Sequence, residues 1–209
     1  MKKMTIPLAI LIVIFGLNAC DEFPETLTVN ETEQKEVTLT RSGWDAYENG
    51  AYITAISEFK DAVIENAYYA DAYNGLGSSY ARLDSLEQAD RYFTIATVTQ
   101  TEYNALTRDI YAGMSFVCLA NEQYEKAVRA VERALIDDDN YELDSQYVFR
   151  HDFSITATDL LLVKAEAYFL LNVYRFCVLT LHQIDETLSI SEDDPEELAA
   201  VIESLRETV

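Results

Sequence analysis

Two stretches of the chain share one pattern of small and large apolar positions among polar ones. Residues 42–63 and 76–97 align so that Gly43 matches Gly77, 34 positions further on. The other pairs at the same spacing are Ala55 with Ala89, Phe59 with Phe93, and Ala62 with Ala96. Helices that pack closely need small residues wherever their backbones approach each other. The pattern therefore predicts a helical hairpin that is repeated along the chain.

The pattern continues through two further stretches, with residues added between the units. Residues 111–135 match with Ala127 in the place of the second small residue, at an offset of 38. Residues 161–184 match with Cys177 in that place, at a further offset of 50. The additional residues of this last interval form an insertion at about 138–157. Self-similarity at such a period indicates a repeat protein with about four units.

These units resemble the tetratricopeptide repeat (TPR) family, whose 34-residue units are helix-turn-helix hairpins. The resemblance covers about residues 36–187 and implies an all-α solenoid, because one unit alone cannot bury its apolar face. It also implies that Gly77 in a first helix contacts Ala89 in a second helix, while Tyr80 and Phe93 fill the space between units. The chain departs from the family pattern in lacking the proline that ends a repeat.

After the last repeat, residues 195–208 are expected to form a helix that caps the solenoid. Asp194 is placed to cap the helix N-terminus, and Pro195 suits the first helical position. Apolar residues recur at helical spacing along one face of this segment, and the other face is charged. The TPR domain is therefore expected over residues 42–209, with this helix at its end.

The first 19 residues have the features of a bacterial export signal. Two lysines precede an apolar run that is shorter than the roughly 20 residues of a membrane-spanning helix. Residues 17–20, Leu-Asn-Ala-Cys, resemble the lipobox of bacterial lipoproteins, which implies a lipid on Cys20. An ordinary signal peptide with an incidental cysteine is the alternative. Residues 20–41 are interpreted as an acidic tether, whose last part can instead begin the first helix.

A lipid on Cys20 predicts a location in the bacterial cell envelope. The outer membrane, with the domain facing the periplasm, is the expected site. The inner membrane is the alternative, because Asp21 directly after the lipidated residue resembles a retention signal.

Charge limits the classes of partner. The formal net charge is −22, and it becomes −22 − 2 = −24 once residues 1–19 leave with Lys2 and Lys3. A surface of this sign repels the phosphates of nucleic acids, so nucleic-acid binding is not expected. A protein or peptide partner is expected instead.

Few residues suggest chemistry. His151 lies beside Asp152 in the insertion, but no metal-ligand spacing, phosphate-binding loop or nucleophile motif accompanies it. We interpret it as structural. Cys118 and Cys177 lie in apolar helical stretches and are interpreted as buried core residues, with a disulfide between them as the alternative. No enzymatic activity, cofactor or metal is therefore expected.

Two surfaces are candidates for binding a partner. In the TPR family partners usually lie in the concave groove of the first helices, and the matching positions here are Trp44, Tyr47, Asn74, Ser78, Arg82, Asp109, Phe116 and Glu166. The second candidate is the insertion, which brings together Tyr147, Phe149, Arg150 and His151. The alternatives are that solvent or the tether covers the groove positions, and that the insertion packs back on the fourth repeat.

The sequence thus predicts a lipid-anchored, non-enzymatic TPR protein that binds a peptide or partner domain in its groove. The alternative function is capture of a glycan or small ligand as part of an uptake system. Tyrosine is abundant, at 14 residues, but most tyrosines match packing positions of the repeat, which weakens the glycan alternative. Fluorescence of Trp44 during a titration with envelope glycans would discriminate between the two functions.

Overall fold

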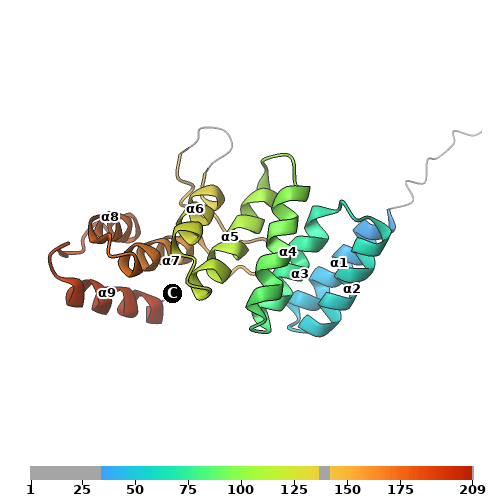
Figure 1. The fold of residues 1–209 in the computed structure, drawn as a ribbon, viewed down its shortest axis with the longest axis horizontal. Helices are drawn as coiled ribbons and strands as arrows, with labels where there is room; N and C mark the ends of the chain where they lie inside the picture. Colours follow the sequence, from blue (N-terminus) through green and yellow to red (C-terminus); the bar gives the residue numbers. More distant parts are fainter. Residues whose placement is uncertain (1–33, 137–141, 209) are drawn as a thin grey trace, which may run out of the picture. The chain divides into compact units, whose positions relative to one another are not determined.

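Four helical hairpins and a final helix make up the described part of the chain. The computed structural model describes residues 34–136 and 142–208, which belong to one compact unit. Figure 1 shows the hairpins side by side in chain order. The helices are α1 (Lys35–Glu48), α2 (Tyr52–Glu65), α3 (Ala70–Arg82), α4 (Leu86–Thr99), α5 (Ala105–Ala120), α6 (Tyr124–Ala134), α7 (Ala157–Leu170), α8 (Tyr174–Ile184) and α9 (Pro195–Thr208).

In each hairpin, three residues connect the two helices, and these turns have similar backbone geometry. The second turn residue has a positive φ in every case, at Gly50 (72°), Asp84 (55°), Glu122 (58°) and Asn172 (59°). These positions lie 34, 38 and 50 residues apart, which are the intervals of the sequence pattern. Gly, Asp and Asn adopt this conformation more readily than other residues. The recurring turn confirms the four repeats.

The first helices of the hairpins form a continuous layer. Helix α1 contacts α3, α3 contacts α5, α5 contacts α7, and α7 contacts α9. The second helices connect each hairpin to the next, as α2 does with α3. We call the surface formed by α1, α3, α5 and α7 the A-helix face, because it carries the groove positions predicted from the sequence.

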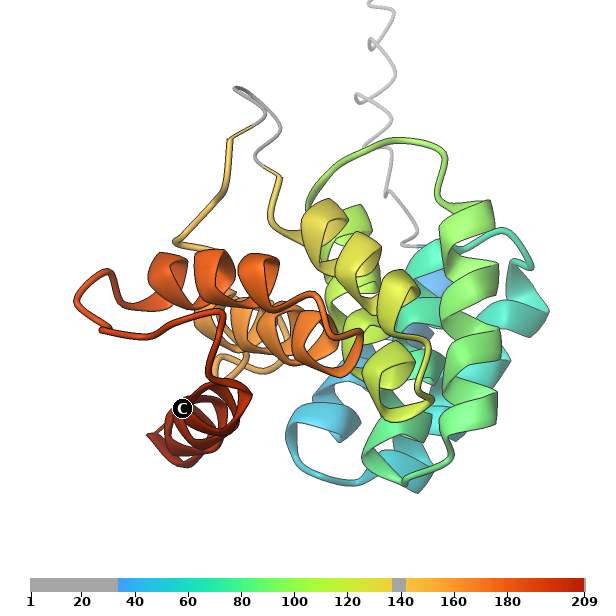
Figure 2. The ribbon, with the colours of Figure 1, turned by 60° about the vertical axis from the view of Figure 1, so that its left-hand side comes forward.

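The final helix closes the layer as predicted. Figure 2 shows α9 beside α7 at the end of the unit. The carboxylate of Asp194 accepts a hydrogen bond from the Glu197 amide at 3.0 Å and so caps the helix. Leu198 and Ile202 are buried in a small core with Leu181 of α8. The apolar side of α9 therefore covers the end of the fourth hairpin.

Phe59 of α2 lies between two glycines of neighbouring first helices. A Cβ added at Gly43 of α1 would lie 2.6 Å from the Phe59 ring, and one added at Gly75 of α3 would lie 2.2 Å from it. Real Cβ atoms do not approach so closely, since protein interiors are already packed to high density. The two glycines therefore make room for one ring that joins the first hairpin to the second.

Phe93 of α4 joins the second hairpin to the third in the same way. A Cβ at Gly77 would lie 2.8 Å from this ring, and one at Gly113 of α5 would lie 2.4 Å from it. The group nearest to Gly77 is thus the Phe93 ring and not Ala89, which corrects the contact predicted from the sequence. Phe93 lies one turn after Ala89 on the same face of α4, and its larger side chain reaches the Gly77 backbone first.

The third hairpin replaces this arrangement with residues of intermediate size. At the repeat offsets of 38 and 50, Val131 takes the place of Phe93, Ser115 that of Gly77, and Val163 that of Gly113. Val131 is fully buried, and Val163 is 5% exposed. A smaller residue on the second helix thus accompanies larger residues on the first helices, which conserves the packed volume.

The first helix begins within the segment interpreted as a tether, as the alternative for its last part allowed. Helix α1 starts at Lys35, so residues 35–41 belong to the first repeat and not to the tether. An ion pair between Lys35 and Glu65 joins its first turn to α2, and Thr40 is buried. The signal, Cys20 and most of the tether lie outside the described residues. Within the described ranges, no helix combines the length and apolar character needed to cross a membrane.

The two described cysteines belong to the core, as predicted. Cys118 and Cys177 are both free and buried. Burial raises the pKa of each thiol to about 11. Both side chains therefore act as small apolar residues in their helices.

Candidate functional site

The described part of the insertion, residues 142–156, lies across the A-helix face. We call this segment the strap. Its Phe149 ring packs 6.2 Å from the Trp44 ring of α1, and its Asp152 forms an ion pair with Arg82 of α3. These contacts and those with α5 lie on the first three hairpins. The alternative that the insertion packs only on the fourth repeat is therefore wrong.

The strap is a short hairpin with its own hydrogen bonds. The amide of Phe149 donates to the carbonyl oxygen of Ile155 at 2.9 Å. The Oδ1 atom of Asp152 accepts bonds from the amide and the hydroxyl of Ser154, at 3.1 and 2.6 Å. Aspartate commonly closes turns in this way, by bonding the backbone two residues further on. These hydrogen bonds within the strap thus help to fix the register of its residues.

Asp109 of α5 holds the middle of the strap. Its Oδ1 accepts a hydrogen bond from the Tyr147 hydroxyl at 2.9 Å, and its Oδ2 pairs with Arg150. Burial raises the pKa values of Asp109 and Tyr147, while the nearby Arg150 acts against both shifts. Arg108 adds an ion pair with Asp144 at 2.5 Å. Charge-assisted bonds of this kind are stronger than neutral ones, so the strap is firmly attached.

His151, which follows Arg150 in the strap, covers Trp44. The two rings are stacked, with centroids 3.7 Å apart and planes 3° from parallel. The Nδ1 atom of His151 lies 2.9 Å from Oε1 of Glu48. His151 thus has the structural role that was favoured from the sequence. Trp44 is 3% exposed, so it offers no stacking surface to a glycan.

The predicted groove positions fall into two groups. Arg82, Phe116 and Glu166 keep access to solvent. The others are buried, namely Trp44, Tyr47, Asn74, Ser78 and Asp109. The strap covers Trp44 and Asp109. Direct contact of a partner with the buried group is therefore not available in this structure.

The predicted insertion surface is mostly turned inward. Tyr147 and Phe149 are buried against the helices, whereas Val148 between them is 42% exposed. This alternation is that of an extended segment with one face packed. Arg150 and His151 are occupied with Asp109 and Trp44. The four residues do gather at one place, as predicted, but they bind the chain's own repeats.

Three residues that interact with the strap were not identified from the sequence, namely Glu48, Asp71 and Asp159. The pairing of Asp152 in the strap with Arg82 was not predicted either. Opposite charge was the available signal. Two basic side chains of the insertion, Arg150 and His151, have acidic counterparts on the A-helix face. A search for such pairs between an insertion and the groove would have indicated where the insertion docks.

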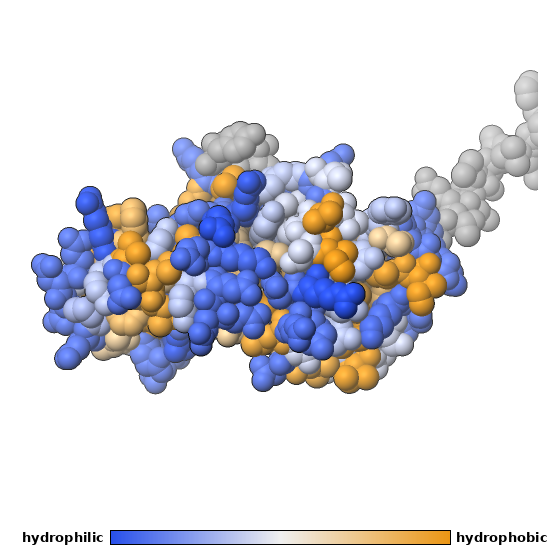
Figure 3. Space-filling view, in the orientation of Figure 1, coloured by the Kyte–Doolittle hydropathy of each residue, from blue (hydrophilic) through white to orange (hydrophobic). Residues whose placement is uncertain are grey.

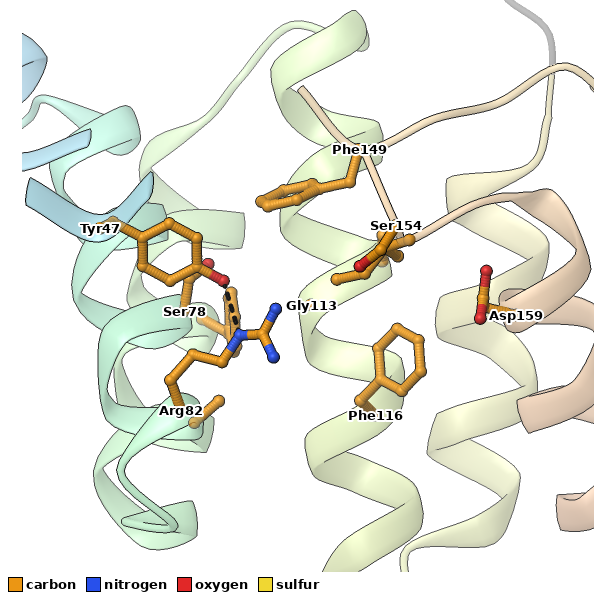
Figure 4. Close-up of a pocket in the computed structure, with 12 residues that line it drawn as sticks. Tyr47, Ser78, Arg82, Gly113, Phe116, Phe149, Ser154 and Asp159 are labelled. Carbon is orange, nitrogen blue, oxygen red and sulfur yellow. Dashed lines mark hydrogen bonds between the residues drawn. The ribbon is translucent and has the colours of Figure 1, made fainter. Parts of the chain in front are cut away.

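A cavity of about 350 Å³ lies between the strap and the A-helix face. We call it the strap cavity, and Figure 4 shows the side chains that surround it. Its walls come from α1, α3, α4, α5, the strap and α7, so no single repeat forms it. The lining residues are Tyr47, Ser78, Ala81, Arg82, Phe93, Ala112, Gly113, Phe116, Phe149, Ser154, Ile155 and Asp159.

A second cavity, of about 400 Å³, lies on the part of the A-helix face that the strap leaves uncovered. We call it the C-terminal cavity. It shares Phe116 and Asp159 with the strap cavity, and at its edge Arg206 of α9 pairs with Glu166 of α7 at 2.5 Å. The lining residues are Phe116, Leu119, Ala120, Tyr124, Asp159, Leu162, Val163, Glu166, Leu170 and Arg206.

The view in Figure 3 shows no large apolar surface on that side of the described unit. Its hydrophobic residues form several small patches separated by hydrophilic ones. Patches of this size occur on most soluble proteins and indicate no partner by themselves. The cavities are therefore better candidate sites than this surface.

Asp71 of α3 carries a carboxyl group that is costly to ionise. Its Oδ1 accepts a hydrogen bond from the indole Nε1 of Trp44 at 3.2 Å. Burial raises the pKa of this carboxyl above its ordinary value of 3.8, although Arg150 and His151 act in the opposite direction. The folded protein therefore holds the Asp71 proton at pH values where the unfolded chain has released it.

We expect Asp71→Asn to raise the free energy of unfolding relative to wild-type protein, by a difference that increases with pH. Because the folded pKa is raised, wild-type protein loses stability as pH rises from 3.8 through the folded pKa. Asparagine has no proton to lose, and its amide oxygen still accepts the bond from Trp44. Urea unfolding of both proteins across this pH range measures the difference. A difference that stays constant, or falls as pH rises, would contradict the expectation.

Two solved structures share this arrangement of helices. YrrB, described as a TPR protein with an unusual peptide-binding site, matches with a TM-score of 0.59 and 15% identity, over 85% of this chain and 80% of YrrB. A tetratricopeptide repeat protein from Parabacteroides merdae matches with a TM-score of 0.54 and 17% identity. That match covers 84% of this chain and 61% of the Parabacteroides chain, which is less than two thirds of it. No protein-family model and no curated protein matches this chain.

Proposed function

We propose that this chain, which has the TPR fold, is a non-enzymatic protein-interaction scaffold held at the bacterial cell envelope by a lipid on Cys20. Its expected place is the outer membrane, with the repeats facing the periplasm. The partner is a peptide or a domain of another protein, which binds in the C-terminal cavity. The lipid raises the effective concentration of the scaffold near membrane-bound partners.

The position of the C-terminal cavity is the observation that carries the proposal. It lies on the same helical layer as the groove predicted from the sequence, but beyond the reach of the strap. Two of the predicted groove residues, Phe116 and Glu166, line it. The structural similarity to YrrB, whose description includes a peptide-binding site, supports a peptide as ligand.

The lining of the C-terminal cavity suits a side chain that is mainly apolar. Leu119, Leu162 and Val163 line it together with the Phe116 ring. Burial of apolar area contributes about 25 cal/mol per Å², so one inserted side chain can contribute about 2 kcal/mol. The charged pair at its edge offers one donor group and one acceptor group to the partner's backbone. The net charge of −22 favours neutral or basic partners over acidic ones.

We expect Leu170→Glu to reduce capture of the partner at least tenfold. Leu170 lines the C-terminal cavity and is 41% exposed, so a carboxylate there disturbs binding without entering the core. Leu179→Glu on α8 is the matched control, because Leu179 is 50% exposed and lies outside the cavity lining. Crosslinking in intact cells followed by mass spectrometry measures the captured proteins. A Cys20→Ser variant should also capture less partner, since it loses the membrane location.

The proposal fails if the Leu170→Glu and Leu179→Glu variants capture the same proteins in equal amounts. It also fails if wild-type protein captures no protein above the level of an unrelated envelope lipoprotein. Circular dichroism of both variants establishes that they are folded, so a loss of capture is not a loss of structure.

A further inference from the structure

We propose that the strap cavity binds a small uncharged molecule with an aromatic or branched apolar body and one carbonyl or amide oxygen. This site adjoins the C-terminal cavity, with which it shares Phe116 and Asp159. It differs in depending on the strap, which is an insertion in the repeats. The proposal rests on the shape of the cavity, on one unpartnered polar group within it, and on its charges.

The strap converts part of an open surface into a partly enclosed site. Phe149, Ser154 and Ile155 of the strap face residues of α3 and α5 across the cavity (Figure 4). Its volume of about 350 Å³ lies in the range of small-molecule pockets. At about 30 Å³ for each water-sized group, this space accommodates a molecule of about ten non-hydrogen atoms.

The apolar part of the lining determines the body of the ligand. The rings of Phe93, Phe116 and Phe149 come from three different elements and line one space. Aromatic rings prefer edge-to-face or offset contacts, and each such pair contributes about 1 kcal/mol beyond its buried area. A flat aromatic or compact branched group is therefore favoured over an extended polar one.

The polar end of the cavity contains a hydroxyl group without a partner. Ser78 is 6% exposed and lines the cavity, and among the described residues its Oγ has no hydrogen-bond partner. A buried hydroxyl left in this state costs about 1–3 kcal/mol. Rotation of the buried Ser78 hydroxyl toward the cavity would let it donate a hydrogen bond to a ligand oxygen and so remove that cost.

Arg82 provides a second donor at the same end. Its Nε donates to the Tyr47 hydroxyl at 3.2 Å, and one terminal nitrogen pairs with Asp152. These bonds use two of the five N–H donors that a guanidinium group carries. Figure 4 shows the guanidinium group extending from α3 into the cavity toward Phe116. Arg82 and Ser78 thus place two donor-bearing residues in the lining of one cavity.

The charges of the cavity favour a neutral ligand. The positive charge of Arg82 is already balanced by Asp152. Asp159 adds a carboxylate to the lining, where it accepts bonds from the amide and hydroxyl of Thr156. A carboxylate ligand would add a further negative charge to a protein of net charge −22, whereas an amide would not.

Fluorine NMR of three matched probes tests the proposal on the purified full-length protein. The probes are 2-(4-fluorophenyl)acetamide, 4-fluorophenylacetate and 1-ethyl-4-fluorobenzene. We expect the amide to bind at least tenfold more tightly than either other probe, because only the amide combines an acceptor with no charge. Tighter binding of the acetate or the ethylbenzene, or no binding of the amide, would overturn the proposal.

Two variants locate the bound probe. Ala81 lines the cavity, so Ala81→Leu should fill it and abolish binding, whereas Ala199→Leu on the exposed side of α9 should have no effect. Ser78→Ala should weaken amide binding about tenfold and should stabilise the unliganded protein, since it removes the unpartnered hydroxyl. Equal amide binding by wild-type and Ala81→Leu protein would place the probe elsewhere and refute the site.

A pentapeptide with a central phenylalanine tests whether the cavity binds a free small molecule or a peptide segment. Its aromatic side chain and neighbouring carbonyl group resemble the amide probe. Binding of the peptide in this cavity without binding of the free amide would overturn the proposal in favour of a peptide site. The proposed partner site is judged independently, because Leu170→Glu changes the C-terminal cavity and leaves the strap cavity lining intact.

Discussion

Replacing Gly113 with valine is expected to lower the free energy of unfolding by about 3 kcal/mol. A Cβ at this position would lie 2.4 Å from the Phe93 ring, which is completely buried. The helix propensity gained by removing a glycine, less than about 1 kcal/mol, offsets only part of this cost. Urea unfolding followed by circular dichroism measures the change.

The third hairpin supplies the control for this prediction. There Val131 and Val163 occupy the places of Phe93 and Gly113. The double variant Phe93→Val with Gly113→Val copies that arrangement, so the ring that opposes the new valine is gone. The double variant should be more stable than the sum of the single changes by at least about 1 kcal/mol. Additive effects of the two substitutions would show that the ring and the glycine are not coupled.

Phe149→Ala is expected to lower the free energy of unfolding by about 3 kcal/mol and to make local opening of the strap near Arg150 more frequent. The Phe149 side chain is 2% exposed and packs near Trp44, so its loss leaves a space that the firmly bonded strap cannot fill. Limited digestion with trypsin should then cleave after Arg150 at least tenfold faster than in wild-type protein. Urea unfolding measures the stability, and mass spectrometry identifies the cleavage site.

Phe153→Ala is the matched control in the same strap. Phe153 is 79% exposed, and the removal of an exposed ring usually changes stability by less than about 0.5 kcal/mol. Equal effects of the two substitutions, or unchanged trypsin cleavage in Phe149→Ala, would mean that the strap is not held by its buried aromatic side chain.

Both effects concern contacts that the sequence indicated only in part. The repeat spacing placed Gly77 and Phe93 correctly in the two helices of one hairpin. It did not reveal that each ring lies between two glycines, because the second glycine belongs to the next unit. That contact depends on how the hairpins stack, and the repeat resemblance describes stacking only in general terms.

The sequence indicated the start of the first helix only as an alternative, for a physical reason. Residues 35–41 contain one acidic residue, two basic residues and two threonines without a sustained apolar period, which is typical of a linker. The helix forms there because Thr40 is buried and Lys35 pairs with Glu65 of α2. Tertiary contacts of this kind commonly override weak local preference.

For the candidate site, too, the sequence indicated the residues but not how they come together. Its residues were identified one by one, since Arg82 and Phe116 follow from the repeat and Phe149 from the insertion. Their gathering around one cavity was not predicted. An insertion without periodicity carries no sign of the surface on which it docks, so its position depends on complementary charge and shape across residues far apart in the chain.

The sequence by itself determined the helical repeats, the four turns and the capping helix, because each depends on residues a few positions apart. Only the tertiary structure decided that the strap crosses the A-helix face, buries Trp44 and Asp109, and leaves the C-terminal cavity open. These features depend on contacts such as that between Tyr147 and Asp109, which are 38 residues apart in sequence. Contacts over such distances form only when the hairpins have stacked, since stacking brings their side chains within reach.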